Sequence, residues 1–269
     1  MTQKNTIKNP YYYMVFFIII LIFTGKNSIA AENQKNEFGV YFGTKLYEER
    51  HPVDNSFFMS QDGWMLGIIG NNETYSDDVY TGYKYQLGYG QVNYTSAGTG
   101  TMTGIPDYQL EGTGYIGIPI NLNNNRLTFF GGLGYRFLLN ASGLKQSSTG
   151  HSGYDRESRY LYVPLGINYE TNATNESYWE FRGEYLHFLY GQQTSKLSQV
   201  SANYNDITND QEEGSGIKLR AKFHFDSSSG IEGYMDYWDI ADSKLDVSGN
   251  FMEPRNTTSE TGIRYFWKF

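Results

Sequence analysis

Apolar and polar residues alternate along most of the chain from residue 37 onward. In the last ten residues, Ile263, Tyr265, Trp267 and Phe269 occupy one parity, whereas the other parity includes Arg264. A period of two residues predicts a β-strand with one apolar and one mostly polar face. Ten such runs lie at residues 38–47, 62–70, 78–94, 108–122, 126–140, 157–169, 178–191, 217–225, 230–242 and 260–269.

The segments between these runs alternate in length. Long polar segments lie at 49–61, 95–107, 141–156, 192–214 and 243–258, and short ones at 71–77, 123–125, 171–177 and 226–229. Barrels in outer membranes show this asymmetry, because their periplasmic turns are short and their surface loops are long. The sequence therefore predicts an all-β fold, a ten-stranded antiparallel up-and-down transmembrane β-barrel with both termini on the periplasmic side.

A two-residue period does not by itself say which face points outward, so a soluble barrel with an apolar cavity is the competing interpretation. The polar parity is rich in glycines and in charges that could pair across strands, and the apolar parity continues through all ten runs. The chain also ends on an aromatic strand, where fraying would expose it in water. Together with the alternating loop lengths, these features favour a barrel whose apolar face meets lipid.

The composition supports a β-barrel and excludes several other classes. The chain has 25 Tyr, 17 Phe, 4 Trp and 30 Gly, and its mean hydropathy of -0.55 excludes a bundle of transmembrane helices. A barrel remains compatible with that value because only alternate residues face lipid. Cysteine is absent, which excludes disulfides, thiol catalysis and cysteine-based metal sites. No cofactor is expected.

Residues 1–30 differ from the rest of the chain. Lys4 and Lys8 precede an apolar run from Met14 to Phe23, and Ser28-Ile29-Ala30 has small residues where a secretory cleavage site needs them. We predict a signal peptide cleaved after Ala30, followed by one barrel domain over 31–269. Cleavage would remove three lysines and change the net charge from -8 to -11, so nucleic acid is not an expected partner.

The terminal pattern ending in Phe269 resembles that of Gram-negative outer-membrane β-barrels. This resemblance implies that Tyr265, Trp267 and Phe269 act as a signal read by the barrel-assembly machinery, and that outer-membrane lipid and lipopolysaccharide surround the protein. The stretches 130–136, 153–158 and 252–256 also resemble those of uncharacterised outer-membrane β-barrel proteins of similar length. That second resemblance implies no activity.

Charged residues gather on the inward parities of the last four strands. They are Glu180, Arg182, Glu184, Lys218, Arg220, Lys222, Glu232, Asp236 and Arg264, with His224, Glu260 and Lys268 on the same parities. A basic column thus lies between acidic ones. The first interpretation is an ion-pair network that fills the lumen of a barrel too narrow to hold much else. The alternative is a narrow porin-like channel for small solutes.

A surface hydrolase is the second alternative, since ten strands is the size of the omptin proteases. That resemblance would imply paired Asp residues and an Asp/His couple at the extracellular rim. His51 and His151 lie in predicted loops near Asp54 and Asp155, but no Asp-x-His triplet is present. We therefore expect no enzyme, and predict that function resides in the five surface loops, which would bind or adhere to a ligand.

Overall fold

The structure is a computed structural model that describes residues 33–172 and 177–269. The predicted signal peptide lies outside these residues. The elements are β1 (Asn33–Arg50), β2 (Phe57–Tyr75), β3 (Tyr80–Ser96), β4 (Gly100–Leu122), β5 (Asn125–Asn140), β6 (Arg156–Glu170), β7 (Tyr178–Ser195), a short 3₁₀ helix (Leu197–Gln199), β8 (Ile207–Gln211), β9 (Gly214–His224), β10 (Ser229–Ile240) and β11 (Asn256–Lys268). In these described parts of the chain, no helix is long and apolar enough to cross a membrane.

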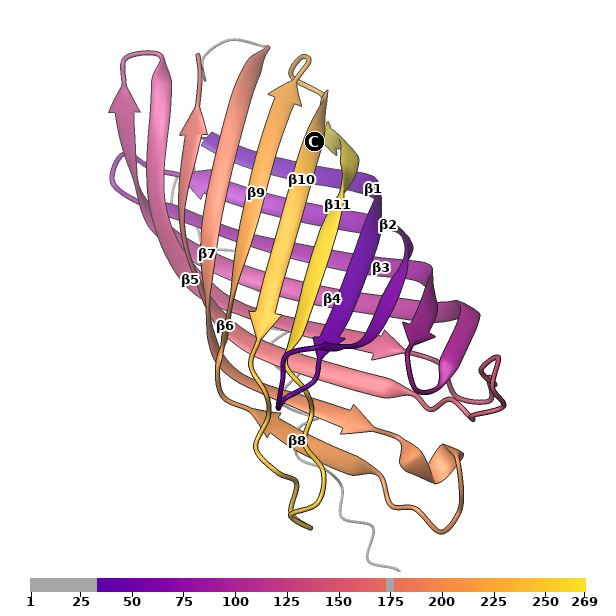
Figure 1. Cartoon of the computed structure of the whole chain (residues 1–269). Coiled ribbons are helices and arrows are strands. Elements are labelled where there is room, and N and C mark those ends of the chain that lie inside the picture. The colour runs from indigo at the N-terminus through magenta and orange to yellow at the C-terminus, as the bar shows by residue number, and fades with distance from the viewer. Residues whose placement is uncertain (1–32, 173–176) are drawn as a thin grey trace, which may run out of the picture.

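The strands form one closed antiparallel barrel. Each strand from β1 to β6 pairs with the next, β6 pairs with β7, and β11 returns to pair with β1. β8 and β9 pair in series along β7, so together they fill one position and the wall has ten. Figure 1 shows the C-terminus at the turn end, and β8 with the β10–β11 connection at the opposite, loop end. The predicted all-β, ten-stranded up-and-down barrel is confirmed.

The apolar parity faces outward. Phe42, Ile116, Leu165 and Ile263 have 53%, 64%, 54% and 58% of their surface exposed, whereas the opposite parity is buried inside the barrel. A soluble protein does not present a continuous apolar exterior around polar contents. The prediction that the apolar parity faces outward is therefore confirmed, and the soluble barrel with an apolar cavity is excluded.

Several strand boundaries were predicted too short. The segments 49–61 and 95–107 were expected to be loops, yet β2 begins at Phe57, β3 continues to Ser96 and β4 begins at Gly100. Part of the expected 192–214 loop is strand as well, because β8 pairs with the end of β7. The reason is that backbone N–H and C=O groups pair regardless of side-chain polarity. Hydrogen bonding between adjacent strands therefore continues into segments whose side chains are polar.

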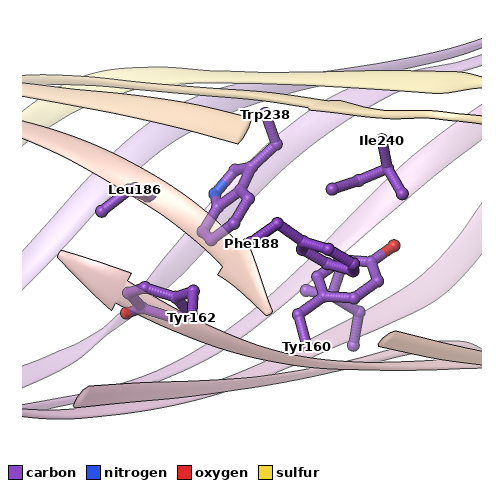
Figure 2. Close-up of a cluster of buried hydrophobic side chains, with 7 residues drawn as sticks. Tyr160, Tyr162, Leu186, Phe188, Trp238 and Ile240 are labelled. Carbon is purple, nitrogen blue, oxygen red and sulfur yellow. The ribbon is translucent and has the colours of Figure 1, made fainter. Parts of the chain in front are cut away.

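Aromatic and charged side chains fill the lumen. Near the loop end, one hydrophobic cluster consists of Leu138, Tyr160, Tyr162, Leu186, Phe188, Trp238 and Ile240. Figure 2 shows six of these side chains, two each from β6, β7 and β10, gathered in the barrel interior. Gly134 makes room for this cluster, since a Cβ there would lie 2.1 Å from the Tyr162 ring.

Candidate functional site

All nine charged residues singled out on the inward parities are buried in the lumen. Each has at most 8% of its surface exposed. β7 contributes Glu180, Arg182 and Glu184, β9 contributes Lys218, Arg220 and Lys222, β10 contributes Glu232 and Asp236, and β11 contributes Arg264.

Most of these residues contact one another. Arg182 Nε donates to Glu184 at 2.8 Å, and Lys222 Nζ lies 3.8 Å from Glu180. On the other side of β9, Arg220 pairs with Asp236, while Arg264 pairs with Glu232. Lys218 is the exception, because its ammonium group pairs with Glu111 on β4 rather than with these strands.

The first half of the barrel supplies partners that the sequence reasoning missed. Lys222 pairs with Glu37 of β1 at 2.8 Å, and Lys45 of β1 pairs with Asp107 of β4 at 2.5 Å. These partners lie on the inward parities of their own strands. Lys45 lies on the inward parity of the predicted run 38–47 and could have been found there, whereas Glu37 and Asp107 lie just outside the predicted runs 38–47 and 108–122.

Four ion pairs among the described residues join strands on opposite walls. Two of them lie at the ends of the barrel, Lys35–Glu170 and Arg156–Glu49, and two lie between these. Arg182 of β7 lies 3.2 Å from Glu73 of β2, and Arg136 of β5 pairs with Glu260 of β11. In each case five steps around the ten-membered wall separate the strands, so the side chains meet across the lumen. A small void elsewhere in the lumen, lined by Lys84, Lys222 and Glu232 among others, measures about 30 Å³, enough for about two waters.

The loop end is different, because the barrel opens there into a cavity of about 310 Å³. We call it the rim cavity. The lining residues come from strand ends and from the connections 97–99, 141–155, 196–206 and 241–255. They are Glu49, Phe58, Met59, Gln61, Tyr94, Thr99, Met102, Ile105, Ser142, His151, Ser152, Gly153, Tyr154, Arg156, Ser195, Leu197, Ile207, Asn209, Phe251, Met252, Glu253 and Pro254.

A cluster of three charges lies in this cavity. Arg156, the first residue of β6, pairs through the same guanidinium nitrogen with Glu49 of β1 and with Glu253 of the 241–255 connection. We call these residues the rim triad. Both carboxylates are buried, with 2% and 6% of their surface exposed. Burial, opposed by Arg156 and reinforced by the nearby Glu49, raises the pKa of the Glu253 carboxyl to about 8.

Short polar contacts hold Glu253 in place. The Glu253 N–H donates to Ser243 Oγ at 2.8 Å, and the Ser243 N–H donates to the Glu253 carbonyl at 2.9 Å. Asn209 of β8 donates its side-chain amide to the carbonyls of Lys244 and Phe251, at 3.2 and 2.9 Å. The 241–255 connection is therefore tied both to itself and to β8, which forms one wall of the cavity.

The two loop histidines do not form an Asp/His couple of the kind sought. His151 lines the rim cavity, but its Nδ1 lies 2.9 Å from Thr149 Oγ1, and Asp155 instead accepts from Gly143 N–H at 2.8 Å. His51 lies 3.6 Å from Asp54 on the exposed β1–β2 connection. Among the residues that the structure describes, no group of His, Asp and Glu side chains could hold a metal ion.

The terminal strand lies where its pattern places it. Tyr265, Trp267 and Phe269 point outward with 39%, 44% and 81% of their surface exposed. β11 pairs with β1 from Glu37–Lys268 to Glu49–Asn256, which closes the barrel. The expected role of Tyr265, Trp267 and Phe269 in assembly stays a prediction.

No family model and no curated protein matches the chain. Among solved structures, the outer membrane protease OmpT from Escherichia coli matches with a TM-score of 0.58 at 10% identity, over 91% of this chain and 99% of OmpT. An outer membrane channel from Pseudomonas putida F1 matches at 0.34, with 10% identity over 87% of this chain and 96% of the channel. The outer membrane phospholipase A from E. coli matches at 0.29, with 10% identity over 84% and 95%. The likeness to OmpT concerns architecture alone, and by that architecture the chain has the fold of an outer-membrane β-barrel.

Proposed function

We propose that this protein resides in a bacterial outer membrane and binds a small ligand at its surface end, with a lumen that does not conduct solutes. In this proposal the signal peptide is removed after Ala30, and lipid and lipopolysaccharide surround the apolar outer face. The barrel then acts as a rigid scaffold for the loops, which is a common division of labour in proteins.

One observation supports this proposal above the others: ion pairs cross the lumen, and a cavity opens beyond them. The Arg136–Glu260 and Arg182–Glu73 pairs join opposite walls, and separating buried partners of this kind costs about 3–5 kcal/mol. The rim cavity, at about 310 Å³, is at the lower end of the volumes that hold small molecules. A barrel whose lumen is closed below an open cavity is suited to binding a ligand and not to conducting solutes.

Conductance tests the closed lumen. We expect the purified barrel to show no stable single-channel steps in planar lipid bilayers. The double variant Arg136→Ala/Glu260→Ala, which removes one bridge together with both of its charges, should allow brief small steps. Stable steps from the wild-type protein that change with Arg220→Glu would instead establish the narrow porin-like channel.

Surface labelling tests location and orientation. Because the chain has no cysteine, single cysteines can be introduced without background. A maleimide too large to pass through outer-membrane pores should label Asn203→Cys, in the exposed 196–206 connection, on intact cells. Asn124→Cys, in the β4–β5 turn, should react only after the envelope is opened. Labelling of both variants on intact cells, or of neither, would contradict the proposed placement.

A further inference from the structure

The rim triad contains one more negative than positive group. Of the described residues that line the rim cavity, Arg156 alone is a lysine or arginine, and it already contacts both Glu49 and Glu253. Inside the lumen the balance differs, since Glu170 is shared by two cations, Lys35 and Arg126. When both rim carboxylates are ionised, the cavity therefore holds a buried negative charge that no cation of its own neutralises.

The rest of the cavity wall suits a cation that carries an apolar body. Phe58, Tyr94 and Phe251 supply aromatic rings, and Met102 and Met252 supply thioethers. Aromatic faces attract organic cations through the ring quadrupole, while methionine adapts its shape to varied apolar groups. Phe58 and Phe251 have 43% and 50% of their surface exposed, so they lie at the mouth and leave the cavity open from the loop end.

We propose that the rim cavity binds an organic monocation, with its charged end at Glu49 and Glu253 and its apolar end against the aromatic and methionine side chains. This inference rests on the proposed binding function and names its ligand class. An anionic ligand is disfavoured, because reaching Arg156 would require it to displace two carboxylates that already hold the guanidinium group.

Binding of a cation should depend on pH through Glu253. The titratable groups around this carboxyl are Glu49 and Tyr47 of β1, Arg156 and Tyr160 of β6, and Tyr154 of the preceding connection. Because the Glu253 pKa is about 8 in the empty cavity, a cation must first displace its proton at lower pH. Affinity should then rise by up to about tenfold per pH unit below pH 8 and level off above it.

Three probes of similar shape test the charge preference. Benzyltrimethylammonium, benzyl alcohol and benzoate can be titrated calorimetrically into the full chain folded in non-ionic detergent at pH 8.5. We expect the cation to bind at least tenfold more tightly than the alcohol, and benzoate to bind no better than the alcohol. The quaternary ammonium carries no titrating proton, so the pH dependence of its binding reports on the protein.

Substitutions assign the effect to the rim triad. Glu253→Gln should lower cation affinity about tenfold, remove its pH dependence and leave benzyl alcohol binding unchanged. The matched control Glu212→Gln alters a carboxylate that is exposed, paired with Lys244 at 2.7 Å and outside the cavity lining, and should change nothing. If Glu253→Gln does not fold, Met102→Lys places an internal cation in the cavity and should abolish binding of the quaternary ammonium.

The outcomes separate this inference from the function on which it rests. If benzyl alcohol or benzoate binds as tightly as the cation, the charge preference is wrong and the rim cavity is still a binding site. If cation affinity is the same in Glu253→Gln, the assignment to this carboxylate is wrong. If none of the three probes binds at millimolar concentration, both the ligand class and the proposed binding function are wrong.

Discussion

The middle of the lumen and the rim cavity are built from the same residue types and differ in how their charges are matched. In the middle, most cations meet a carboxylate from a regular strand, as in the Lys45–Asp107 pair at 2.5 Å. At the rim, one guanidinium serves two carboxylates, and Glu253 comes from a connection rather than a strand. The first arrangement closes space, whereas the second leaves a cavity with an unmatched charge.

The position of a charge, on a paired strand or in a connection, decides what it can do. The backbone of a strand residue is hydrogen-bonded to the neighbouring strands, which holds its side chain in position. Such side chains can meet across the barrel and exclude solvent. A residue in a connection is held by fewer contacts, such as the pair between Ser243 and Glu253, and it can yield to a ligand.

The largest loss of stability is expected when one partner of an opposite-wall ion pair is removed and the other stays buried. Arg136→Met should destabilise the folded barrel by about 3–5 kcal/mol, because Glu260 would remain buried without its cation. Adding Glu260→Leu should restore much of this loss, since a well-packed apolar pair avoids the desolvation penalty. Urea unfolding in detergent micelles or vesicles measures both variants.

An exposed ion pair provides the control for this prediction. Arg255 lies 2.6 Å from Asp239 and is half exposed, so Arg255→Ala should cost about 1 kcal/mol or less. Equal losses for Arg136→Met and Arg255→Ala would mean that the lumen is hydrated and that the opposite-wall pairs do not close it.

A smaller effect is expected from a neutral group of the lumen. Tyr162 donates its hydroxyl to Glu111 and lies 2.8 Å from Thr113 Oγ1, so Tyr162→Phe should cost about 1.5–3 kcal/mol, as for hydrogen bonds to charged groups. Tyr185→Phe, on the exposed outer face, is the matched control and should be nearly neutral. If Tyr162→Phe leaves the free energy of unfolding unchanged, Lys218 alone is a sufficient partner for Glu111.

The fold could be predicted from the sequence because lipid imposes a period that each strand repeats. The parities of Phe42, Leu165 and Ile263 are readable one strand at a time, and agreement among ten strands removes the ambiguity of any one. The ends of the strands were harder to predict from the sequence. At 57–61 and 100–107 the regular two-residue period is lost, yet the backbone pairing continues.

The rim triad could not be predicted in the same way. Glu49, Arg156 and Glu253 come from three distant segments, and all three belong to stretches expected to be polar loops. Their meeting depends on how the 241–255 connection folds back onto the barrel, which no local period encodes. By contrast, lumen charges such as Arg220 and Asp236 lie at adjacent strands with a readable parity, and their proximity follows from the strand order.

The docking of the 241–255 connection should weaken as pH rises. The Glu253 pKa of about 8 in the folded state exceeds its ordinary value of 4.5, so the docked connection holds a proton that an undocked one releases. Docking is then most stable below about pH 4.5 and loses stability up to pH 8. Between pH 6.5 and 7.5 the loss should reach up to about 1.4 kcal/mol.

Hydrogen exchange measures this change with a control in the same segment. Protection of the Glu253 amide, bound to Ser243 Oγ, should fall over that range after correction for intrinsic exchange. The Phe251 amide donates to Asp246, whose pKa the Ser248 hydroxyl and nearby N–H groups lower to about 2, so this local turn should not respond. Glu253→Gln should remove the effect, and a decline that persists in that variant would assign it to another group.

The smallest effect on stability is expected at the C-terminus, where the proposed consequence lies in assembly. Phe269 has 81% of its surface exposed, and its N–H donates to the Asn36 carbonyl, a bond that alanine keeps. Phe269→Ala should therefore change the free energy of unfolding by about 0.5 kcal/mol or less. If Tyr265, Trp267 and Phe269 form the assembly signal, the same variant should nevertheless lower the amount of folded barrel in cells at equal expression.

Phe225→Ala separates a signal from a general loss of outer-face aromatic surface. Phe225 follows β9 at the same turn end and has 42% of its surface exposed, so it meets a similar environment without belonging to the terminal strand. Quantifying heat-modifiable protein in cells, and refolding yield in detergent, distinguishes the two variants. Only Phe269→Ala should be deficient in cells, and both should refold normally in detergent, because the assembly machinery is absent there. Equal losses of folded barrel in cells would show that the terminal aromatic acts through its contact with the membrane and not as a signal.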